Sequence, residues 1–222
     1  MFKLKTKDRF KVSPIAYQVA KPFIQQKHYT GTMGNYKVAY GLFDTEQMTR
    51  VGLLDEPKLV GVITYGHITY KDIAQAIFEG GTSQNCWEFT RMAVDDDCDC
   101  PRTYFISQTI RDIRRNYKQI KCLVSFADMT QNHHGGVYQA ASWTYCGKVK
   151  GSYHYMKGDN RVHKRSVFTK AIKEGRKEKE YAITEGYEKI KEKIKFRYIF
   201  PLDRRIKLKV KKMKYPKELE LI

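Results

Sequence analysis

The sequence predicts a single three-layer α/β domain. Helical and strand patterns alternate along its 222 residues, and no linker long enough to divide the chain separates them. The composition, with 41% apolar and 13% aromatic residues, is sufficient for a substantial core. Residues 120–128 form a near-continuous apolar segment, which is typical of a central strand buried on both faces. We therefore expect one α/β domain over residues 1–222.

The first elements are a helix and a hairpin. Ser13 followed by Pro14 predicts a helix start, because the hydroxyl can cap free amides and proline fits the first turn. This helix should run to about His28. Two segments rich in β-branched and aromatic residues, 36–44 and 58–65, predict the strands of a hairpin. The next expected elements are a short helix and a third strand, over residues 72–78 and 86–94.

The second half of the chain continues the alternation. Residues 103–116 repeat apolar side chains at helical spacing, and the apolar strand 120–128 follows them. Residues 186–195 contain Glu-to-Lys pairs with Ile190 and Ile194 at helical spacing, which favours a solvated helix face for that segment over a nucleic-acid surface. The remaining expected elements are a short helix over 135–143 and strands over 143–149 and 195–200.

Net charge is the main clue to a partner. The chain has 42 Lys and Arg against 24 Asp and Glu, a formal net charge of +18, which points to a polyanion. Residues 151–222 hold 22 of the basic and 10 of the acidic residues. We predict that this basic C-terminal region binds the phosphates of double-stranded DNA, because each phosphate neutralised by a cation releases a counterion. The candidate contacts are Lys195, Arg197, Arg204, Arg205, Lys207, Lys209, Lys211 and Lys212.

The sequence also indicates a cellular compartment. No apolar run reaches the ~20 residues needed to span a bilayer, and the first residues lack the apolar stretch of a signal peptide. The five cysteines form no CxxC pair, which favours free thiols in a reducing compartment. We expect a cytoplasmic protein without membrane attachment, for which a homodimer is compatible with the sequence.

Five short motifs carry a family resemblance. They are Lys-His-Tyr-Thr-Gly (27–31), Glu-Phe-Thr-Arg-Met-Ala-Val-Asp-Asp (88–96), Val-Ser-Phe-Ala-Asp (124–128), the segment from His133 to Gly147, and Lys-Phe-Arg-Tyr-Ile-Phe-Pro-Leu-Asp (195–203). Their order resembles that in the Mom DNA-modification proteins of bacteriophages. The resemblance covers most of residues 20–210, and the order of the motifs is more specific than any one of them.

This resemblance implies a fold and an activity. Mom-type proteins look like members of the GNAT acyltransferase superfamily, whose central sheet is mixed and mostly antiparallel. The family is associated with placing a carbamoylmethyl (acetamido) group on the exocyclic amine of adenine in phage DNA, which protects that DNA from restriction. The resemblance therefore implies a phage-encoded transferase that acts on DNA in the bacterial host cytoplasm, and acetyl-CoA or a related acyl donor as its cofactor.

The resemblance also implies site residues. The residues implicated in the family's activity fall here on His28, Tyr29, Arg91, Asp128 and Tyr138. Asp128, at the carboxyl edge of a central strand, could accept a proton from the adenine amine or orient it, and Tyr138 could protonate a thiolate leaving group. Arg91 could clamp a phosphate or carbonyl. His28 and Tyr29 could form a wall for a base rotated out of the duplex, with the tyrosine stacking on it.

Each of these residues also has a purely structural alternative. Asp128 could cap the turn that follows it, and Tyr138 could be a core residue with its hydroxyl at the surface. Arg91 could pair with a nearby carboxylate, and His28 could simply complement the helix dipole.

The cofactor region departs from the superfamily pattern. Residues 95–105 lack the glycine-containing loop that usually binds the pyrophosphate of acyl-CoA, so the candidate cofactor contacts reduce to Arg91, Val94, Arg102 and Thr103. Metal-ligand spacings are absent, which argues against a structural zinc site. An iron site with His or carboxylate ligands suits so unusual a transfer, but no spacing specifies one.

Two other functions fit parts of the sequence. An ordinary N-acetyltransferase acting on a small amine or a protein would use acetyl-CoA without DNA, and the missing glycine loop counts against it. A non-enzymatic DNA-binding protein on a GNAT-like scaffold would explain the charge. It gives no reason for the ordered set of polar residues at strand and helix ends.

Overall fold

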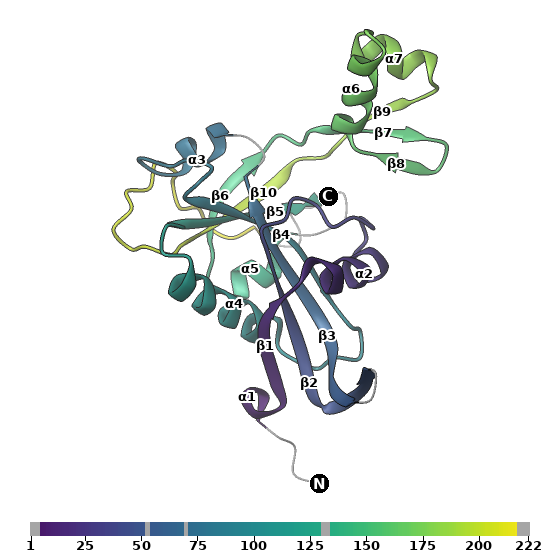
Figure 1. Ribbon diagram of the computed structural model, residues 1–222. Coiled ribbons are helices and arrows are strands. Elements are labelled where there is room, and N and C mark those ends of the chain that lie inside the picture. The colour runs from purple at the N-terminus through teal and green to yellow at the C-terminus, as the bar shows by residue number, and fades with distance from the viewer. Residues whose placement is uncertain (1–4, 52–53, 69–70, 130–133, 217–222) are drawn as a thin grey trace. The chain divides into compact units, whose positions relative to one another are not determined.

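The computed structural model describes residues 5–51, 54–68, 71–129 and 134–216 (Figure 1). Two compact units can be distinguished by their internal contacts, although the sequence shows no linker between them. Unit 1 comprises Met1–Ser125, Gly135–Cys146 and Tyr198–Tyr215, and unit 2 comprises Phe126–His134, Gly147–Arg197 and Pro216–Ile222. No linker is needed, because the body of unit 2 is inserted in the chain between two pieces of unit 1.

A seven-stranded sheet forms the centre of the fold. Its order is β1-β2-β3-β4-β5-β10-β6, and the first four strands pair antiparallel with one another. β4 and β5 pair in parallel, with Cys86 opposite Cys122, so the sheet is mixed and mostly antiparallel as predicted. The strands are β1 Phe10–Ile15, β2 Val38–Val51, β3 Leu54–His67, β4 Cys86–Val94, β5 Cys122–Asp128, β6 Thr144–Val149 and β10 Lys195–Pro201.

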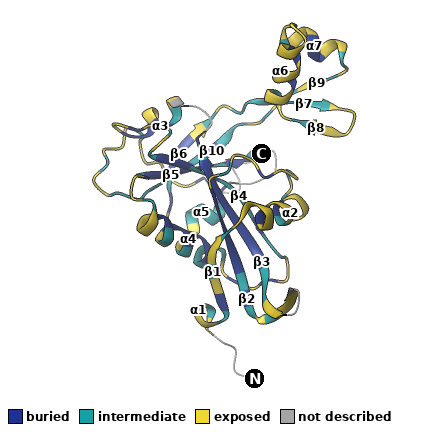
Figure 2. Ribbon diagram, viewed as in Figure 1, coloured by how far each residue is buried: buried dark blue, intermediate teal, exposed yellow. Residues whose placement is uncertain are grey.

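Helices cover both faces of this sheet, which makes the predicted three layers (Figures 1 and 2). On one face, Ala20 and Ile24 of α2 pack in a buried cluster with Ala39 of β2. On the other face, the neighbouring Tyr40 donates a hydrogen bond to Asp112 of α4 at 2.8 Å. Consecutive strand residues therefore serve opposite layers. The helices of this unit are α1 Thr6–Arg9, α2 Tyr17–Lys27, α3 Lys71–Ile77, α4 Arg102–Asn116 and α5 Gly136–Ala140.

Most predicted elements are confirmed, but the predicted start of the first helix is wrong. Ser13 and Pro14 lie in β1, opposite Gly41 and Tyr40, and the helix begins at Tyr17. β1 is the edge strand of the sheet, where a proline without an N–H group costs no ladder hydrogen bond. The edge position depends on which strand β1 pairs with, and the local sequence does not reveal that.

Residues 147–197 of unit 2 form what we call the inserted lobe. Its three-stranded sheet has the order β8-β7-β9, and its helices pack on it through Tyr155, Val167, Ala171, Tyr181 and Ala182. Its elements are β7 Tyr153–Lys157, β8 Asn160–Val162, α6 Lys164–Lys173, α7 Glu178–Thr184 and β9 Glu188–Lys191. The predicted helix over 186–195 is therefore wrong, since Glu188–Lys191 pairs as a strand with β7.

Glycines end both helices of the inserted lobe. Gly175 and Gly186 have φ angles of 66° and 70°, a conformation that side chains disfavour. The amide of Arg176 reaches back to the Ala171 carbonyl, and that of Tyr187 to the Ala182 carbonyl. This is the Schellman arrangement, which stops a helix firmly. Gly186 thus separates α7 from β9 and explains why residues 186–195 do not form a helix of their own.

Acidification is expected to loosen α6. The Nδ1 atom of His163 accepts a hydrogen bond from the amide of Arg165, which caps the helix. Partial desolvation and the charge of Lys164 lower the pKa of His163 below its ordinary 6.5. The unfolded lobe therefore takes up this proton first, so the stabilisation is full above about pH 6.5 and is lost as the pH falls through the folded-state pKa.

Hydrogen exchange of the α6 amides, corrected for intrinsic rates, measures this effect. We expect protection to fall by about 1 kcal/mol, the worth of a helix cap, between neutral pH and a pH well below 6.5. His163→Asn retains a capping oxygen that does not titrate and should lose less protection. Equal pH dependence in both proteins would contradict the role given to His163.

No helix among the described residues is long and apolar enough to cross a membrane. All five cysteines are buried free thiols, as expected from their spacing.

Candidate functional site

The loop after α2 presents His28 and Tyr29. Their rings stack with centroids 4.4 Å apart, and half of Tyr29 remains exposed. The amide of Thr30 donates to Nδ1 of His28 at 3.2 Å, so the neutral ring carries its proton on Nε2. An exposed tyrosine backed by a second ring is a suitable platform for a planar ligand.

Arg91 ties this loop to the sheet. From β4 its Nε atom donates to the Thr32 carbonyl at 2.9 Å, and one terminal nitrogen donates to the Thr90 carbonyl at 2.7 Å. The guanidinium lies so close to Gly34 that a Cβ atom there would be 2.9 Å from its Cζ atom, and Gly34 has a φ of 71°. These contacts favour a positioning role for Arg91 in holding the segment that follows His28 and Tyr29.

Tyr138 is enclosed by aromatic rings. Its centroid lies 5.5 Å from that of Phe89, 5.3 Å from Trp143 and 5.4 Å from Tyr198. Burial raises the pKa of Tyr138 far above its usual range, and the nearby phenol of Tyr29 raises it further. The structure thus brings two of the predicted site residues into one neighbourhood. Because the phenol stays protonated, Tyr138 can donate a hydrogen bond to a developing negative charge.

Ser125 is a member of this neighbourhood that sequence reasoning missed. Its side chain hydrogen-bonds Tyr138, which partly offsets the rise in the pKa of that phenol. Ser125 also donates to the Phe89 carbonyl at 3.3 Å, across the β4–β5 pair. Ser125 lies on β5, and its polar side chain between the apolar residues Val124 and Phe126 was the signal available in the sequence.

Asp128 ends β5 and lies in unit 2 with its side chain 10% exposed. Its Oδ2 atom is 4.0 Å from Nζ of Lys195, which in turn contacts Glu192 at 2.8 Å. The alternative that Asp128 caps the following turn concerns residues 130–133, which lie outside the described part of the chain. Within unit 2, the carboxylate belongs to a network of charged groups.

Glu192 is the centre of that network. Its carboxylate, 9% exposed, also accepts from Arg161 at 2.9 Å and lies 3.7 Å from Nδ1 of His154. Burial alone would raise the pKa of Glu192, but the hydrogen bond and charge of Lys195 outweigh it and the pKa falls. Burial lowers the pKa of His154, so that ring is neutral at pH 7. Lys195 is therefore occupied by carboxylates in the structure.

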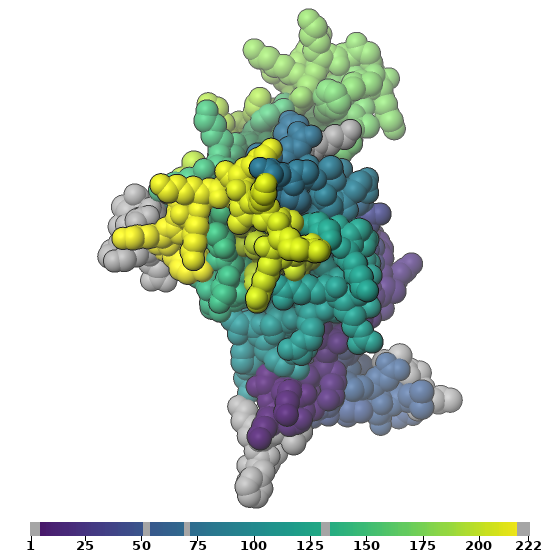
Figure 3. Space-filling view, turned by 90° about the vertical axis from the view of Figure 1, so that its left-hand side faces the viewer, coloured from purple at the N-terminus to yellow at the C-terminus, as the bar shows by residue number. Residues whose placement is uncertain are grey.

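The other predicted DNA contacts differ in their exposure to solvent and in whether a carboxylate already pairs with them. Arg205 pairs with Asp203 at 2.9 Å while remaining 87% exposed, and Lys207 lies 3.7 Å from Glu79. Arg197 is half-buried. The segment after β10 has little regular structure and lies on the surface, where it is coloured yellow in Figure 3. Hydrogen bonds hold it there, and one of them runs from the Tyr215 hydroxyl to the Trp143 carbonyl. Arg204, Lys209, Lys211 and Lys212 are exposed as well.

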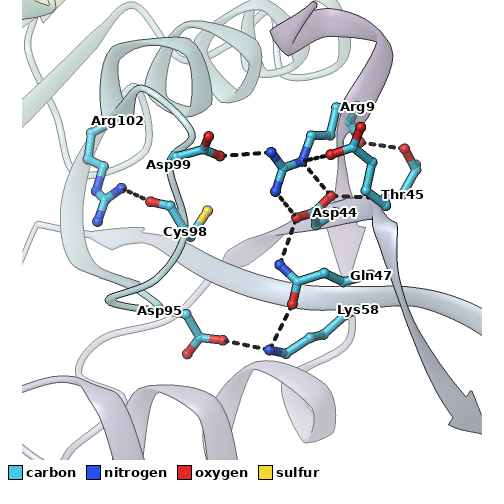
Figure 4. A network of polar contacts seen from close by, with 10 residues as sticks. Arg9, Asp44, Thr45, Gln47, Lys58, Asp95, Cys98, Asp99 and Arg102 are labelled. Atoms are coloured by element: carbon cyan, nitrogen blue, oxygen red, sulfur yellow. Dashed lines mark hydrogen bonds and ion pairs between the residues drawn. The ribbon is translucent and has the colours of Figure 1, made fainter. Parts of the chain in front are cut away.

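The segment between β4 and α4 does not fit a pyrophosphate group (Figure 4). Asp99 pairs with Arg9 at 3.1 Å, and Asp95 pairs with Lys27 at 3.1 Å. The Arg102 guanidinium donates to the Cys98 carbonyl at 2.8 Å, so this cation already binds the backbone of its own loop. Four aspartates and no glycine in residues 95–101 disfavour an anion here. Of the predicted cofactor residues, Val94 ends β4 and Arg102 begins α4 without forming such a cradle.

Thr103 lines a cavity within unit 1 instead. The cavity has a volume of about 420 Å³ and lies between α4, α5 and Phe200 of β10. Arg111 and Arg114 supply positive charge at its wall, and the Arg114 guanidinium also rests 5.2 Å from the centroid of the Phe200 ring. A cavity of this size with two cations and an apolar floor suits an anionic ligand with an apolar part.

Among the described residues, no group of three or more His, Cys, Asp or Glu side chains could hold a metal ion. The described histidines and carboxylates therefore give no support to the iron site considered from the sequence.

A family model described as the Mom protein family matches residues 9–217 of this chain. Methylcarbamoylase mom of Escherichia phage Mu is 25% identical over 177 residues, which cover 74% of this chain and 68% of that protein. The solved structure of Arabidopsis thaliana NAA60 in complex with acetyl-CoA has a TM-score of 0.50 and 8% identity, covering 86% of this chain and 99% of that chain. Spermidine/spermine N-acetyltransferase SpeG from Vibrio cholerae has a TM-score of 0.48 and 8% identity, covering 89% and 95%. The predicted GNAT fold is confirmed.

Proposed function

Because this chain belongs to the Mom protein family, we propose that it is a DNA-modification transferase that places a carbamoylmethyl group on the exocyclic amine of adenine. The observation that carries the proposal is the match over residues 9–217, which includes all five residues implied by the resemblance. The relative from phage Mu is named a methylcarbamoylase, and a methylcarbamoyl group is an isomer of a carbamoylmethyl group, so this similarity supports transfer of a group of the same composition. We propose that the modification protects phage DNA from restriction, as the family resemblance implies.

Chemistry on this amine requires the base to leave the duplex, because the reacting atom is otherwise held in a base pair within the stack. We propose that Tyr29, half-exposed and backed by the His28 ring, stacks on the extruded base. Arg91 would act through the loop by fixing the segment that follows these two residues. Tyr29→Leu should then weaken modification more than it weakens duplex binding.

Asp128 and Tyr138 have different roles in the proposed transfer step. The lone pair of the adenine amine forms the new bond to the transferred carbon, while the bond from that carbon to the donor's leaving group breaks. The leaving group keeps the electron pair, and the amine proton passes to a base, the role that the family resemblance implies for Asp128. Tyr138 would stabilise the departing anion by donating a hydrogen bond, since its raised pKa keeps the phenol protonated.

The donor is an activated carbamoylmethyl or related acyl compound. The carboxylates and the occupied Arg102 side chain do not fit the pyrophosphate of acyl-CoA at residues 95–102. The cavity lined by Thr103, Arg111 and Arg114 is the better candidate for an anionic donor. This assignment rests on charge and shape within unit 1.

Analysis of DNA nucleosides tests the proposed function. Plasmid DNA from bacteria that express the protein should contain an adenine nucleoside heavier by one carbamoylmethyl group, detected by mass spectrometry against DNA from cells with the empty vector. Turnover of acetyl-CoA with small amines and unchanged nucleosides would identify an ordinary N-acetyltransferase. Tight duplex binding with unchanged nucleosides would identify a non-enzymatic DNA-binding protein.

A further inference from the structure

The inserted lobe carries a charge excess of its own. Residues 147–197 contain 16 Lys and Arg against 7 Asp and Glu. Part of this charge is neutralised within the lobe, because Arg161 pairs with Glu192 and Arg176 with Glu174. Residues 164–179 hold seven basic and two acidic residues of this total. This segment comprises α6, the turn after it and the start of α7.

One face of α6 displays the cations. Val167 and Ala171 are buried against the lobe, which fixes the orientation of the helix. At 100° per residue, the opposite face holds Arg165, Thr169 and Lys173, all exposed. In the described part of the chain, no carboxylate lies within ion-pair distance of Arg165 or Lys173. These cations are thus presented to solvent by a helix whose inner face is firmly packed.

Apolar side chains border this row. Phe168 is 48% exposed and Ile172 is 59% exposed, and both lie along one edge of the same face. Lys170 lies along the other edge and is also exposed, and its ammonium group donates a hydrogen bond to the Tyr187 hydroxyl at 3.5 Å. A helix face that combines exposed cations with a few apolar side chains is suited to a groove lined by phosphates, where apolar atoms can contact thymine methyl groups.

The face is held in a fixed shape. His163 caps the start of α6, and the bond from Arg176 to the Ala171 carbonyl closes its end at Gly175. Because the helix backbone is already ordered, binding through it costs less backbone conformational entropy than binding through an irregular segment that must become ordered. The segment 202–216, by contrast, has little regular structure.

We propose that α6 of the inserted lobe is the element that docks double-stranded DNA, with Arg165, Lys170 and Lys173 facing its phosphates and the helix lying in the major groove, which is about 12 Å wide. This inference rests on the proposed function, because it names the surface by which that enzyme would hold its substrate. It shifts the main contact from residues 204–212 to a folded helix. The positive charge of this face requires an anionic partner, and the proposed activity on DNA selects a DNA duplex as that partner.

A charge-removal variant tests the assignment. Arg165→Gln/Lys170→Gln/Lys173→Gln keeps good helix formers at all three positions, and its fold is checked by circular dichroism. Binding to a short fluorescent duplex should weaken by about 10- to 100-fold at low salt, and the slope of log affinity against log salt should fall by about 2 to 3. The matched control removes three exposed lysines of unit 1, with Lys7→Gln/Lys21→Gln/Lys118→Gln.

The outcomes separate this inference from the proposed function. If the parent protein binds and modifies DNA but the α6 variant binds no worse than the control, the inference is overturned while the function stands. Unchanged DNA binding together with loss of self-association in Phe168→Ser would show that this face binds a second copy, which also overturns it. If the parent neither binds nor modifies DNA, the proposed function itself fails.

Discussion

Asp128→Asn is expected to lower the rate of DNA modification by about 10²- to 10⁴-fold, the usual contribution of a general base. Asparagine has nearly the volume of aspartate and can still accept a hydrogen bond, but it does not take up the proton released by the amine. The loss should appear in the rate of the transfer step under saturating DNA, measured by mass spectrometry of nucleosides over time.

DNA affinity and folding should be retained in this variant. Lys195 keeps its closer partner Glu192 at 2.8 Å when the charge of Asp128 is removed, so the network of unit 2 remains paired. Asp159→Asn makes the same chemical change at an exposed position of the inserted lobe and serves as the control. If Asp128→Asn modifies DNA at the parental rate, Asp128 takes no part in the transfer reaction.

The sequence predicted the layers and most elements, because strong local periodicity decided them. The alternation on β2 and the apolar spacing of α4 are visible residue by residue. The exceptions depended on pairing at a distance. Pro14 is compatible with β1 only because that strand lies at an edge, and residues 188–191 become a strand only because β7 is available to pair with them.

The sequence indicated which residues to consider for the candidate site, but it did not indicate most of the contacts that these residues make. Local stacking brings His28 and Tyr29 together, as their adjacency suggests. Lys195 was assigned to DNA because its neighbours are basic, and the structure shows in addition that it pairs with Glu192 and lies near Asp128. The spacing of Glu192 and Lys195 shows that they can pair, whereas their burial depends on the surrounding lobe. Sequence charge therefore located the basic region and not the individual cations that are free to bind.

Arg9→Met is expected to destabilise unit 1 by about 3–5 kcal/mol, the largest stability effect we predict. Asp44 is fully buried and receives two hydrogen bonds from the Arg9 guanidinium, at 2.9 and 2.7 Å (Figure 4). Without Arg9 this carboxylate would keep the Gln47 side chain and the Glu46 amide as partners, but no cation. A buried carboxylate without its counter-charge costs more than the pair contributes, so most of the loss is the penalty of the orphaned charge.

Urea unfolding followed by circular dichroism measures this effect, and two further variants identify its origin. Arg9→Lys keeps the charge without the two-pronged contact and should lose less stability. Arg9→Met/Asp44→Asn removes the orphaned charge and should recover more than half of the loss. A loss of less than about 1 kcal/mol in Arg9→Met, the range of an exposed ion pair, would show that Asp44 is solvated.

The pH dependence of the same loss gives an independent check. The hydrogen bond from Arg9 lowers the pKa of Asp44 below its ordinary 3.8, so the parent protein keeps this stabilisation above that pH and loses it as the pH falls through the folded-state value. In Arg9→Met the buried carboxylate takes up a proton at a higher pH than in the parent, which relieves the penalty. The difference in stability between the two proteins should therefore narrow steadily as the solution is made more acidic. A difference that stays constant down to the acid limit of folding would mean that lost packing of the arginine side chain, and not the charge of Asp44, causes the destabilisation.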